Sequence, residues 1–233
     1  MTLFTGTSTP SPATGLPRVF AMFDETIRRV FSEVLNSGEE AVAETDIDVR
    51  EDSFDAESQT NPQLRRRAAA SICREFSAVA AQAADRRAAL TEMVRMIANC
   101  LEVDTCSVFV LDDHSGDLIL AATMGLNQSS VGRVRMRLSQ GLVGLVAQEL
   151  QPVFSENAPK HRRFLLFPEA GEEPYVSFFG VPILLHGNLQ GVLVVQTIER
   201  RNLSLNWPIV AMAAQRIAPF IKSVPISGFH PGA

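Results

Sequence analysis

Two glycines three residues apart, Gly141 and Gly144, stand in the segment "LSQGLVGLVAQELQPVFSENAPKHRRF" (138–164) with a lone histidine and paired arginines. Such residues could hold a phosphate or supply a catalytic base. A P-loop, however, needs a lysine and a spacing that do not follow "GLVG", and a dinucleotide fingerprint needs a third glycine after a parallel strand. The pattern instead predicts a short helix that begins at Gly141, faces a sheet through Leu142, and approaches another backbone closely at Gly144. Its N-terminal amides remain available to an anionic group as a secondary role.

Histidine and cysteine supply the other candidates for chemistry. Among the four histidines, only His161 lies in a segment expected to border a cavity, and no Ser, Cys or Asp motif partners it. A catalytic triad is therefore unsupported, and we expect His161 to anchor its loop by a hydrogen bond. Cys106 begins an apolar strand and Cys100 ends a helix, which are common places for buried structural thiols. With Cys73 they form no CxxC pair, so we expect no metal site and no catalytic residue.

The bulk composition indicates a globular protein. The chain has 233 residues, of which 46% are hydrophobic and 20% charged, enough for a sizeable core. A net charge of -5 argues against general nucleic-acid binding. The N-terminus lacks the pattern of a signal peptide, and no apolar run reaches the length of a membrane span. We therefore expect a cytoplasmic protein in a reducing compartment, with no membrane or nucleic-acid partner and no cofactor.

Three stretches of different composition precede the main domain. Residues 1–16 are rich in Thr, Ser, Pro and Gly and predict disorder. Residues 17–36 predict an amphipathic helix whose apolar stripe could bury against its own domain, a second copy or another protein; the stripe is Phe20, Phe23, Ile27, Val30 and Val34. Residues 37–60 predict an acidic linker, because Glu39 to Glu57 carries nine acidic residues against one arginine. A minor alternative is that this run contacts the arginines at 65–67.

From residue 61 onward the pattern predicts helices, then strands, then a helix. Asn61-Pro62 starts one helix, and Asp85 caps a second with Leu90, Val94, Ile97 and Leu101 on one face. Five apolar segments predict strands of an antiparallel sheet: "TCSVFVLD", "LILAATMG", "VRMRL", "VSFFGVPILL" and "LQGVLVVQTIE". A last helix follows, capped by Asn206 or Ser204 and kinked or ended by Pro219. Residues 224–233 form a tail, and the whole predicts an α+β domain over 61–223.

Several motifs in this order resemble a GAF domain, and more narrowly the N-terminal GAF domain of the phosphoenolpyruvate-protein phosphotransferases of the nitrogen regulatory system. They are "CSV" before an apolar strand and an acid, "AT-x-GL", "GLVGLVA", "H-x-x-F" with a later Pro-Glu, "SFFGVPI" and "GVLVVQ", and they cover roughly residues 90–223. The chain departs from that family in its long N-terminal segment and in "SLNWP" before the last helix. None of its histidines stands in a phosphoacceptor context, so the phosphotransfer chemistry is not carried over.

The resemblance implies a six-stranded antiparallel sheet with a helical bundle on one face and a capped pocket on the other. It also implies a homodimer, and glutamine or a related metabolite as effector. Transferred by position, the pocket is bordered by eight residues: Gly141, Leu142, Phe154, His161, Phe164, Phe167, Ser177 and Phe179. The plain alternative is that several of these aromatic side chains simply fill the core.

Other GAF activities leave residue signatures that this sequence lacks. Cyclic-nucleotide binders carry an Asn-Lys-Phe-Asp-Glu pattern, which is absent here. Bilin binders need a cysteine in the cap region, and this sequence has no cysteine after Cys106. Free methionine-(R)-sulfoxide reductases carry cysteines where this sequence has "RVRMRL", "GLVGLV" and "SENAPKH". We therefore expect a non-catalytic sensory or regulatory protein that signals through its helical bundle. The alternatives are an interaction module with an occluded pocket and, less favoured, such a thiol-based reductase.

Overall fold

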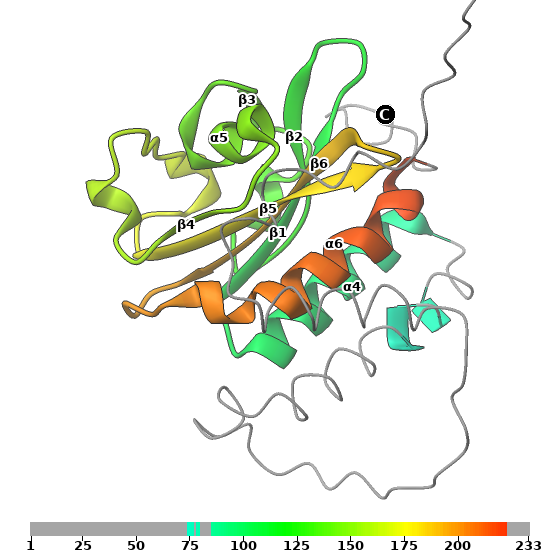
Figure 1. The fold of residues 1–233 in the computed structure, drawn as a ribbon, viewed down its shortest axis with the longest axis horizontal. Helices are drawn as coiled ribbons and strands as arrows, with labels where there is room; N and C mark the ends of the chain where they lie inside the picture. Colours follow the sequence, from blue (N-terminus) through cyan, green and yellow to red (C-terminus); the bar gives the residue numbers. More distant parts are fainter. Residues whose placement is uncertain (1–73, 77, 80–84, 223–233) are drawn as a thin grey trace, which may run out of the picture. The chain divides into compact units, whose positions relative to one another are not determined.

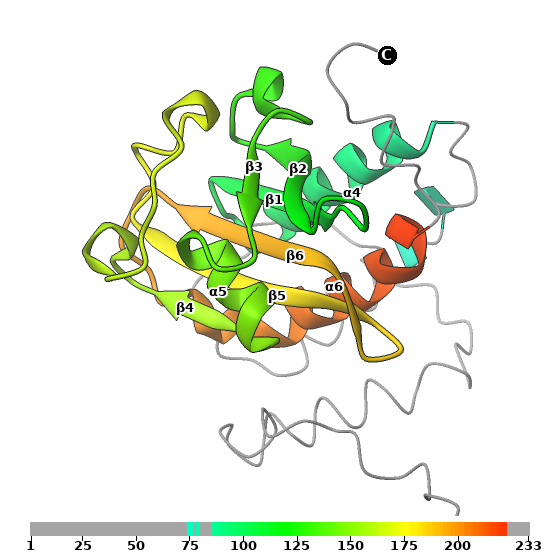
Figure 2. The same ribbon diagram turned by 90° about the horizontal axis from the view of Figure 1, so that it is seen from above.

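The computed structural model describes residues 74–76, 78–79 and 85–222. The predictions for residues 1–16, 17–36, 37–60 and 224–233 lie outside these residues, as does the helix start at Asn61-Pro62. Within the described part, a six-stranded antiparallel sheet separates two layers (Figure 1). Helices α4 and α6 pack on one side, which we call the helical side, and helix α5 packs on the other, the α5 side (Figure 2). The predicted α+β architecture is confirmed.

The strand order across the sheet is β3-β2-β1-β6-β5-β4. Neighbours along the chain are joined by hairpins at β1–β2 and β5–β6, and β1 pairs with β6 to unite the two halves. The strands are β1 (Thr105–Leu111), β2 (Asp117–Met124), β3 (Arg135–Arg137), β4 (Val153–Ser155), β5 (Ser177–Leu185) and β6 (Asn188–Thr197). The segments predicted as strands from their residue pattern include all of them except β4.

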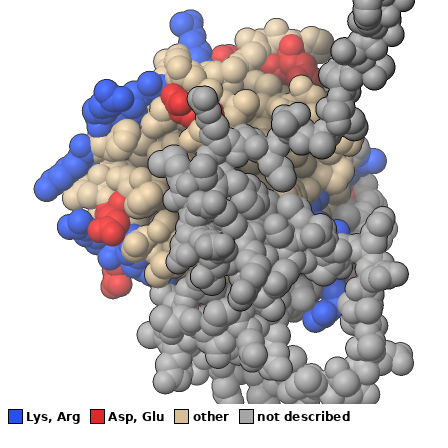
Figure 3. All heavy atoms as spheres, in the orientation of Figure 1, with Lys and Arg blue, Asp and Glu red and all other residues tan. Residues whose placement is uncertain are grey.

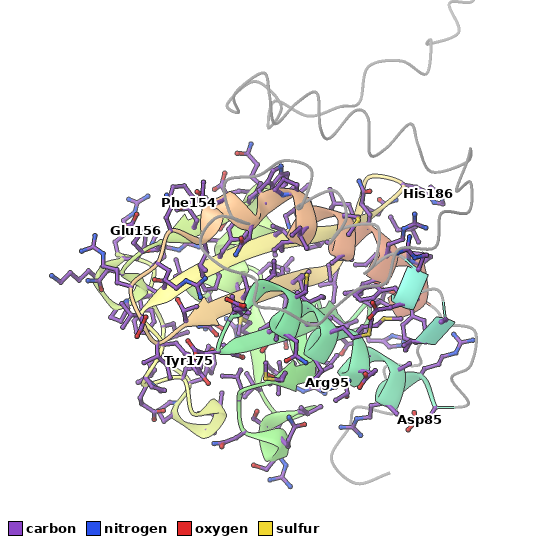
Figure 4. The ribbon with its side chains drawn as sticks, turned by 90° about the horizontal axis from the view of Figure 1, so that it is seen from below. Asp85, Arg95, Phe154, Glu156, Tyr175 and His186 are labelled. Carbon is purple, nitrogen blue, oxygen red and sulfur yellow. The ribbon has the colours of Figure 1, made fainter. Side chains whose placement is uncertain are left out.

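Helix α4 (Arg86–Leu101) begins after the predicted cap and buries the predicted apolar face. The Asp85 carboxylate accepts a hydrogen bond from the Arg87 N–H at 2.9 Å, and this residue marks the start of the helix in Figure 4. The apolar stripe, Leu90, Val94, Ile97 and Leu101, is buried against β1 and β2. Burial of this face, more than helix propensity, stabilises a helix of this length.

Helix α6 (Trp207–Lys222) follows a turn that was not predicted and continues past one of its predicted ends. A 3-10 turn, η5 (Leu203–Asn206), precedes it, and the Asn202 side chain accepts from the Ser204 N–H at 3.1 Å. Asn202 is therefore the cap of η5, a turn that the sequence did not predict, and the cap of α6 at Asn206 or Ser204 stays a prediction. At the other end the helix continues past Pro219 to Lys222. Pro219 is exposed and lies in the last turn, where few intrahelical bonds remain to be lost.

Helix α5 (Gly141–Glu149) lies close to the sheet because two glycines make room. A Cβ at Gly144 would stand 2.9 Å from the carbonyl oxygens of Arg137 and Leu138, which confirms the close backbone approach predicted for this residue. A Cβ at Gly180 in β5 would stand 2.9 Å from side-chain carbons of Val146 and Phe178. The helix therefore packs directly over β5 and β6, as Figure 2 shows.

No helix among the described residues is long and apolar enough to cross a bilayer.

Candidate functional site

The alternation of side chains along β5 divides the residues predicted to border one pocket. Phe178 is buried in the core of the α5 side. Phe179 points to the opposite side, where its ring contacts the Trp207 indole of α6 at a centroid distance of 6.3 Å. Ser177 shares the face of Phe179, and Phe154 of β4 pairs with Phe179 in register. Phe154 lies near the N-terminal end of α6, as Figure 4 shows.

Ser177, Phe179 and Phe154 therefore lie on the helical side, and the prediction that they border the α5-side pocket is corrected. Transfer by position did not account for the period of two that a strand imposes on its side chains. Ser177 has a structural role: its buried hydroxyl accepts from the Arg201 N–H at 2.8 Å and lies 3.3 Å from the carbonyl oxygens of Glu156 and Glu199.

The other five predicted residues lie on the α5 side. Leu142 is buried in that core, and Phe164 and Phe167 pack against it with part of each ring exposed. Gly141 opens α5 with φ at +66°. His161 Nδ1 accepts the Arg163 N–H at 3.1 Å, so its predicted role as a loop anchor is confirmed. Ligand binding by any of the five stays a prediction.

Residues 152–174, which we call the cap, connect α5 to β5 and include β4. Basic side chains gather at the left edge of the view in Figure 3, where Figure 1 places β4 and the loop that follows. One of the cap's arginines, Arg163, donates from Nη2 to the Ser139 carbonyl at 2.7 Å and to the Gln148 side-chain oxygen at 3.2 Å. Deeper in the cap, the Ala158 N–H donates to the Val176 carbonyl at 2.7 Å. The contacts of Arg163 and Ala158 hold the cap to α5 and to the residue that precedes β5.

Glu172 is a half-buried carboxylate in the cap. Its Oε2 accepts the Phe167 N–H at 3.3 Å, which closes the turn around η4 (Pro168–Ala170). Burial raises the pKa of Glu172 to about 7, and the neighbouring carboxylates of Glu169 and Glu173 act in the same direction. The cap therefore contains a group that changes charge near neutral pH.

On the α5 side of the sheet, four polar side chains lie on the neighbouring strands β2, β1 and β6. We call them the polar row: Thr105, Ser107, Thr123 and Gln196. Gln196 pairs with Phe178 of β5, which faces the α5 side, and with Thr105 of β1. Ser107 follows Thr105 at the next position on the same face of β1, and it pairs with Thr123 of β2. All four side chains therefore lie on the α5 side. Sequence reasoning missed this row. The available signal is the alternation of the polar Thr105 and Ser107 with apolar neighbours at the start of "TCSVFV".

Three members of the polar row are bonded to the protein. The hydroxyl oxygens of Ser107 and Thr123 lie 2.8 Å apart, and Thr105 donates to the Met124 carbonyl at 2.6 Å. Beside them, the buried Tyr175 hydroxyl donates to the Gly125 carbonyl at 2.8 Å. These groups are satisfied without a ligand.

Gln196 is the exception. The residue is only 6% exposed, yet its side-chain amide bonds to no group among the described residues. Every completely buried side-chain nitrogen or oxygen of those residues has a partner, so the amide itself holds part of the remaining exposure. An amide that has no protein partner in a side chain so little exposed is uncommon and requires an explanation.

The described thiols do not resemble reactive groups. Burial raises the pKa of Cys106 far above its ordinary value and that of Cys100 to about 11. Burial thus disfavours, in both, the thiolate that nucleophilic or redox chemistry needs near neutral pH. No group of three or more His, Cys, Asp or Glu within the described ranges is placed to hold a metal ion.

The sequence profile of the GAF domain family matches residues 83–212. The chain belongs to the GAF domain family. The phosphoenolpyruvate-dependent phosphotransferase system protein of Escherichia coli strain K12 is 35% identical over 111 residues, which are 48% of this chain. Those residues are 15% of the E. coli protein, so the chain spans only a small part of the curated relatives it matches.

Solved structures agree with this assignment. The GAF domain of a phosphoenolpyruvate-protein phosphotransferase from Coxiella burnetii is 33% identical with a TM-score of 0.62, covering 70% of this chain and 97% of that one. The corresponding Acinetobacter GAF domain is 34% identical with a TM-score of 0.58, covering 68% and 93%. A free methionine-R-sulfoxide reductase from Neisseria meningitidis, 18% identical with a TM-score of 0.58, covers 73% and 93% and shares the fold.

Proposed function

We propose that this GAF domain is a non-catalytic regulatory module that binds a small metabolite between the polar row and the layer formed by α5 and the cap. The observation that carries the proposal is the unpartnered amide of Gln196, buried on this side of the sheet. The resemblance to phosphotransferase GAF domains supports a regulatory role. It also makes glutamine, the effector proposed for that family, the first candidate, with a link to nitrogen status.

The ligand signal would cross the sheet through β5. Phe178 faces the α5 side, and the next residue, Phe179, contacts Trp207 at the start of α6. A shift of β5 on ligand binding therefore changes the packing of α6, through which the helical side reaches a partner. Coupling of this kind is typically about 1–3 kcal/mol, which biases the state of a partner without forcing it.

Calorimetry and tryptophan emission test the proposal together. The full chain is titrated with glutamine, 2-oxoglutarate and nucleotides, and Trp207, the single tryptophan, reports on the helical side. We expect heat of binding and a change in emission with one of them. In the Phe179→Leu variant the heat should remain while the emission change shrinks. The absence of heat and of any thermal shift with every ligand would refute the sensor.

A second candidate is an interaction module whose α5-side layer stays closed. Leu142, Val143, Val146 and Phe178 are all buried there, as expected of a filled core. In this proposal the stripe from Phe20 to Val34 carries partner binding or homodimerisation. Deleting residues 1–60 separates the two functions: loss of self-association in analytical ultracentrifugation with retained ligand binding assigns interaction to that stretch.

The thiol reductase is the enzymatic rival, because its fold is shared. Cys106 lies buried in β1, away from the segments in which the reductases carry their cysteines. We expect no reduction of free methionine-(R)-sulfoxide by the full chain. Activity that disappears on replacing Cys73 or Cys106 by serine would establish the rival.

A further inference from the structure

We propose that Gln196 is the recognition residue of the α5-side layer, and that its ligand presents an uncharged edge that both donates and accepts hydrogen bonds, as a carboxamide or lactam does. This inference rests on the proposed regulatory function and adds the chemical class of the ligand to it.

The position of Gln196 leaves its amide to a ligand. In register, Gln196 lies between Thr105 of β1 and Phe178 of β5, on the side covered by α5. The Thr105 hydroxyl is occupied by the Met124 carbonyl, and the hydroxyls of Ser107 and Thr123 bond to each other. The neighbouring side chains in the polar row are therefore already paired. The two N–H donors and the carbonyl acceptor of Gln196 remain available.

The strand context shows that folding alone does not require an amide here. Val192 and Val194 occupy the two preceding positions on the same side of β6 and are fully buried in the core. An apolar side chain at 196 would continue that row, whereas the amide of Gln196 meets only the small part of the residue that is exposed and has no protein partner there. Keeping a polar group where the fold would accept an apolar one is typical of binding sites.

The surroundings favour an uncharged ligand group. The buried residues of the α5 side are apolar or uncharged: the polar row and Tyr175 supply its polar groups, and none of these carries a charge at neutral pH. Asp112 is the one buried charged residue in the part of the chain described, and it is engaged with Ser115 and Arg135 at the β1–β2 turn. A ligand carboxylate or ammonium beside Gln196 would therefore find no counter-charge in the core.

The primary amide of Gln196 pairs best with a ligand group that carries a hydrogen-bond donor and an acceptor side by side. Glutamine and asparagine side chains pair with two-point donor–acceptor edges, as they do with the edge of adenine. A carboxamide or lactam offers such an edge without charge, whereas a carboxylate only accepts. Phe178, directly opposite Gln196 on the neighbouring strand, supplies an apolar ring for the rest of the ligand.

The first test needs no ligand. In the full unliganded chain, Gln196→Met replaces the amide by an apolar group of similar length, and we expect the Tm to rise by about 2–4 °C. The matched control is Gln190→Met in the same strand, whose amide donates to the carbonyls of Asn188 and Leu189 and should give no rise. A fall in Tm for Gln196→Met would overturn the proposal, because the amide would then contribute to packing.

The second test uses matched amide and carboxylate probes, acetamide against acetate and nicotinamide against nicotinate, followed by ligand-observed NMR and calorimetry. We expect at least one amide to bind about tenfold more tightly than its carboxylate, and to lose about tenfold in affinity in Gln196→Met. Equal or tighter binding of the carboxylates, or no binding by either amide, overturns the assigned ligand class.

The outcomes separate this inference from the regulatory function. An effector that changes Trp207 emission equally in the wild type and in Gln196→Met overturns the role of Gln196 and supports regulation. An amide probe that binds the wild type, fails to bind Gln196→Met and leaves Trp207 emission unchanged supports the recognition residue and overturns the regulatory function.

Discussion

The ring of Phe179 meets the indole of Trp207 edge to face, with centroids 6.3 Å apart and ring planes inclined by 68°. Phe179 comes from the middle layer of the domain and Trp207 from the first residue of α6, so the pair fixes how this helix begins on the sheet. Since Trp207 is the one tryptophan in the chain, its emission reports directly on this contact.

Replacing Phe179 by leucine should lower the free energy of unfolding by about 1–2 kcal/mol, because a buried ring and its edge contact are lost while the site stays apolar. Urea unfolding followed at Trp207 measures the change, and the native emission should shift to longer wavelength. Phe154→Leu is the matched control on the same side of the sheet. Because the Phe154 side chain is 56% exposed, this variant should lose less than about 0.5 kcal/mol in free energy of unfolding. Equal losses at both positions would mean that the aromatic contact contributes little.

Alanine at Gly144 should destabilise the domain by about 1–3 kcal/mol, although alanine is normally the better helix former. The added Cβ would stand 2.9 Å from two backbone carbonyl oxygens, which cannot move aside as a flexible side chain can. Thermal and urea unfolding measure the effect. At Gly116, where nothing lies within 4 Å, alanine meets only the cost of its positive φ, about 1 kcal/mol. If Gly144→Ala proved stabilising, the close contact of α5 with the end of β3 would be refuted.

Removing the Arg163 side chain should loosen the cap selectively. Arg163→Ala loses the hydrogen bonds to Ser139 and Gln148, which are partly exposed and together contribute little to global stability, about 1 kcal/mol or less. Amide hydrogen exchange should speed up in residues 152–174 and stay unchanged in β1 and β6. The neighbouring exposed Arg162, replaced by alanine, serves as control. Uniform exchange in both variants would show that these bonds do not hold the cap.

The carboxyl of Glu172 should make stability depend on pH. Its pKa in the folded chain is about 7, above the ordinary value of 4.5, so the folded state holds this proton more tightly than the unfolded state. Its contribution to stability is fully present below pH 4.5 and is lost as the pH rises to about 7. The wild type should therefore lose stability across this window relative to Glu172→Gln, which keeps an acceptor for the Phe167 N–H. The adjacent exposed Glu173→Gln is the control and should follow the wild type. Parallel curves for wild type and Glu172→Gln would contradict the assignment.

The two thiols of the described residues should resist alkylation in the native chain. Iodoacetamide at pH 8 reacts with thiolate, and burial raises the pKa of Cys106 and of Cys100 well above that pH. Peptide mass spectrometry should find both unmodified under native conditions and modified in urea. Rapid native labelling of Cys106 would indicate an accessible thiol and reopen the case for thiol chemistry.

The sequence predicted elements with a strong local signal. Asp85 predicted the start of α4, and the apolar spacing from Leu90 to Leu101 predicted its buried face. Both the cap and the apolar period depend only on residues within a few turns of the chain. The close approach at Gly144 was predictable for the same reason, since a glycine inside an apolar helical segment usually has a packing cause.

The candidate site was predicted less completely, since it depends on register between distant strands. Resemblance placed Phe154, Ser177 and Phe179 in the pocket, whereas the alternation of β5 turns them to the helical side. Gln196 was missed for a related reason: within "GVLVVQT" it looks like the polar end of a strand. Only its pairing with Thr105 and Phe178 shows that it lies on the α5 side of the sheet, where it is almost fully buried.

The two outermost strands of the described sheet, β3 and β4, have three residues each. So short a row of unpaired backbone amides and carbonyls offers little to an incoming strand, and Arg135 and Arg137 add charge along one of these rows. The sheet therefore ends in borders that discourage edge-to-edge growth between copies at high cellular concentration. Association between copies is thereby left to side-chain surfaces and not to the open edges of the sheet.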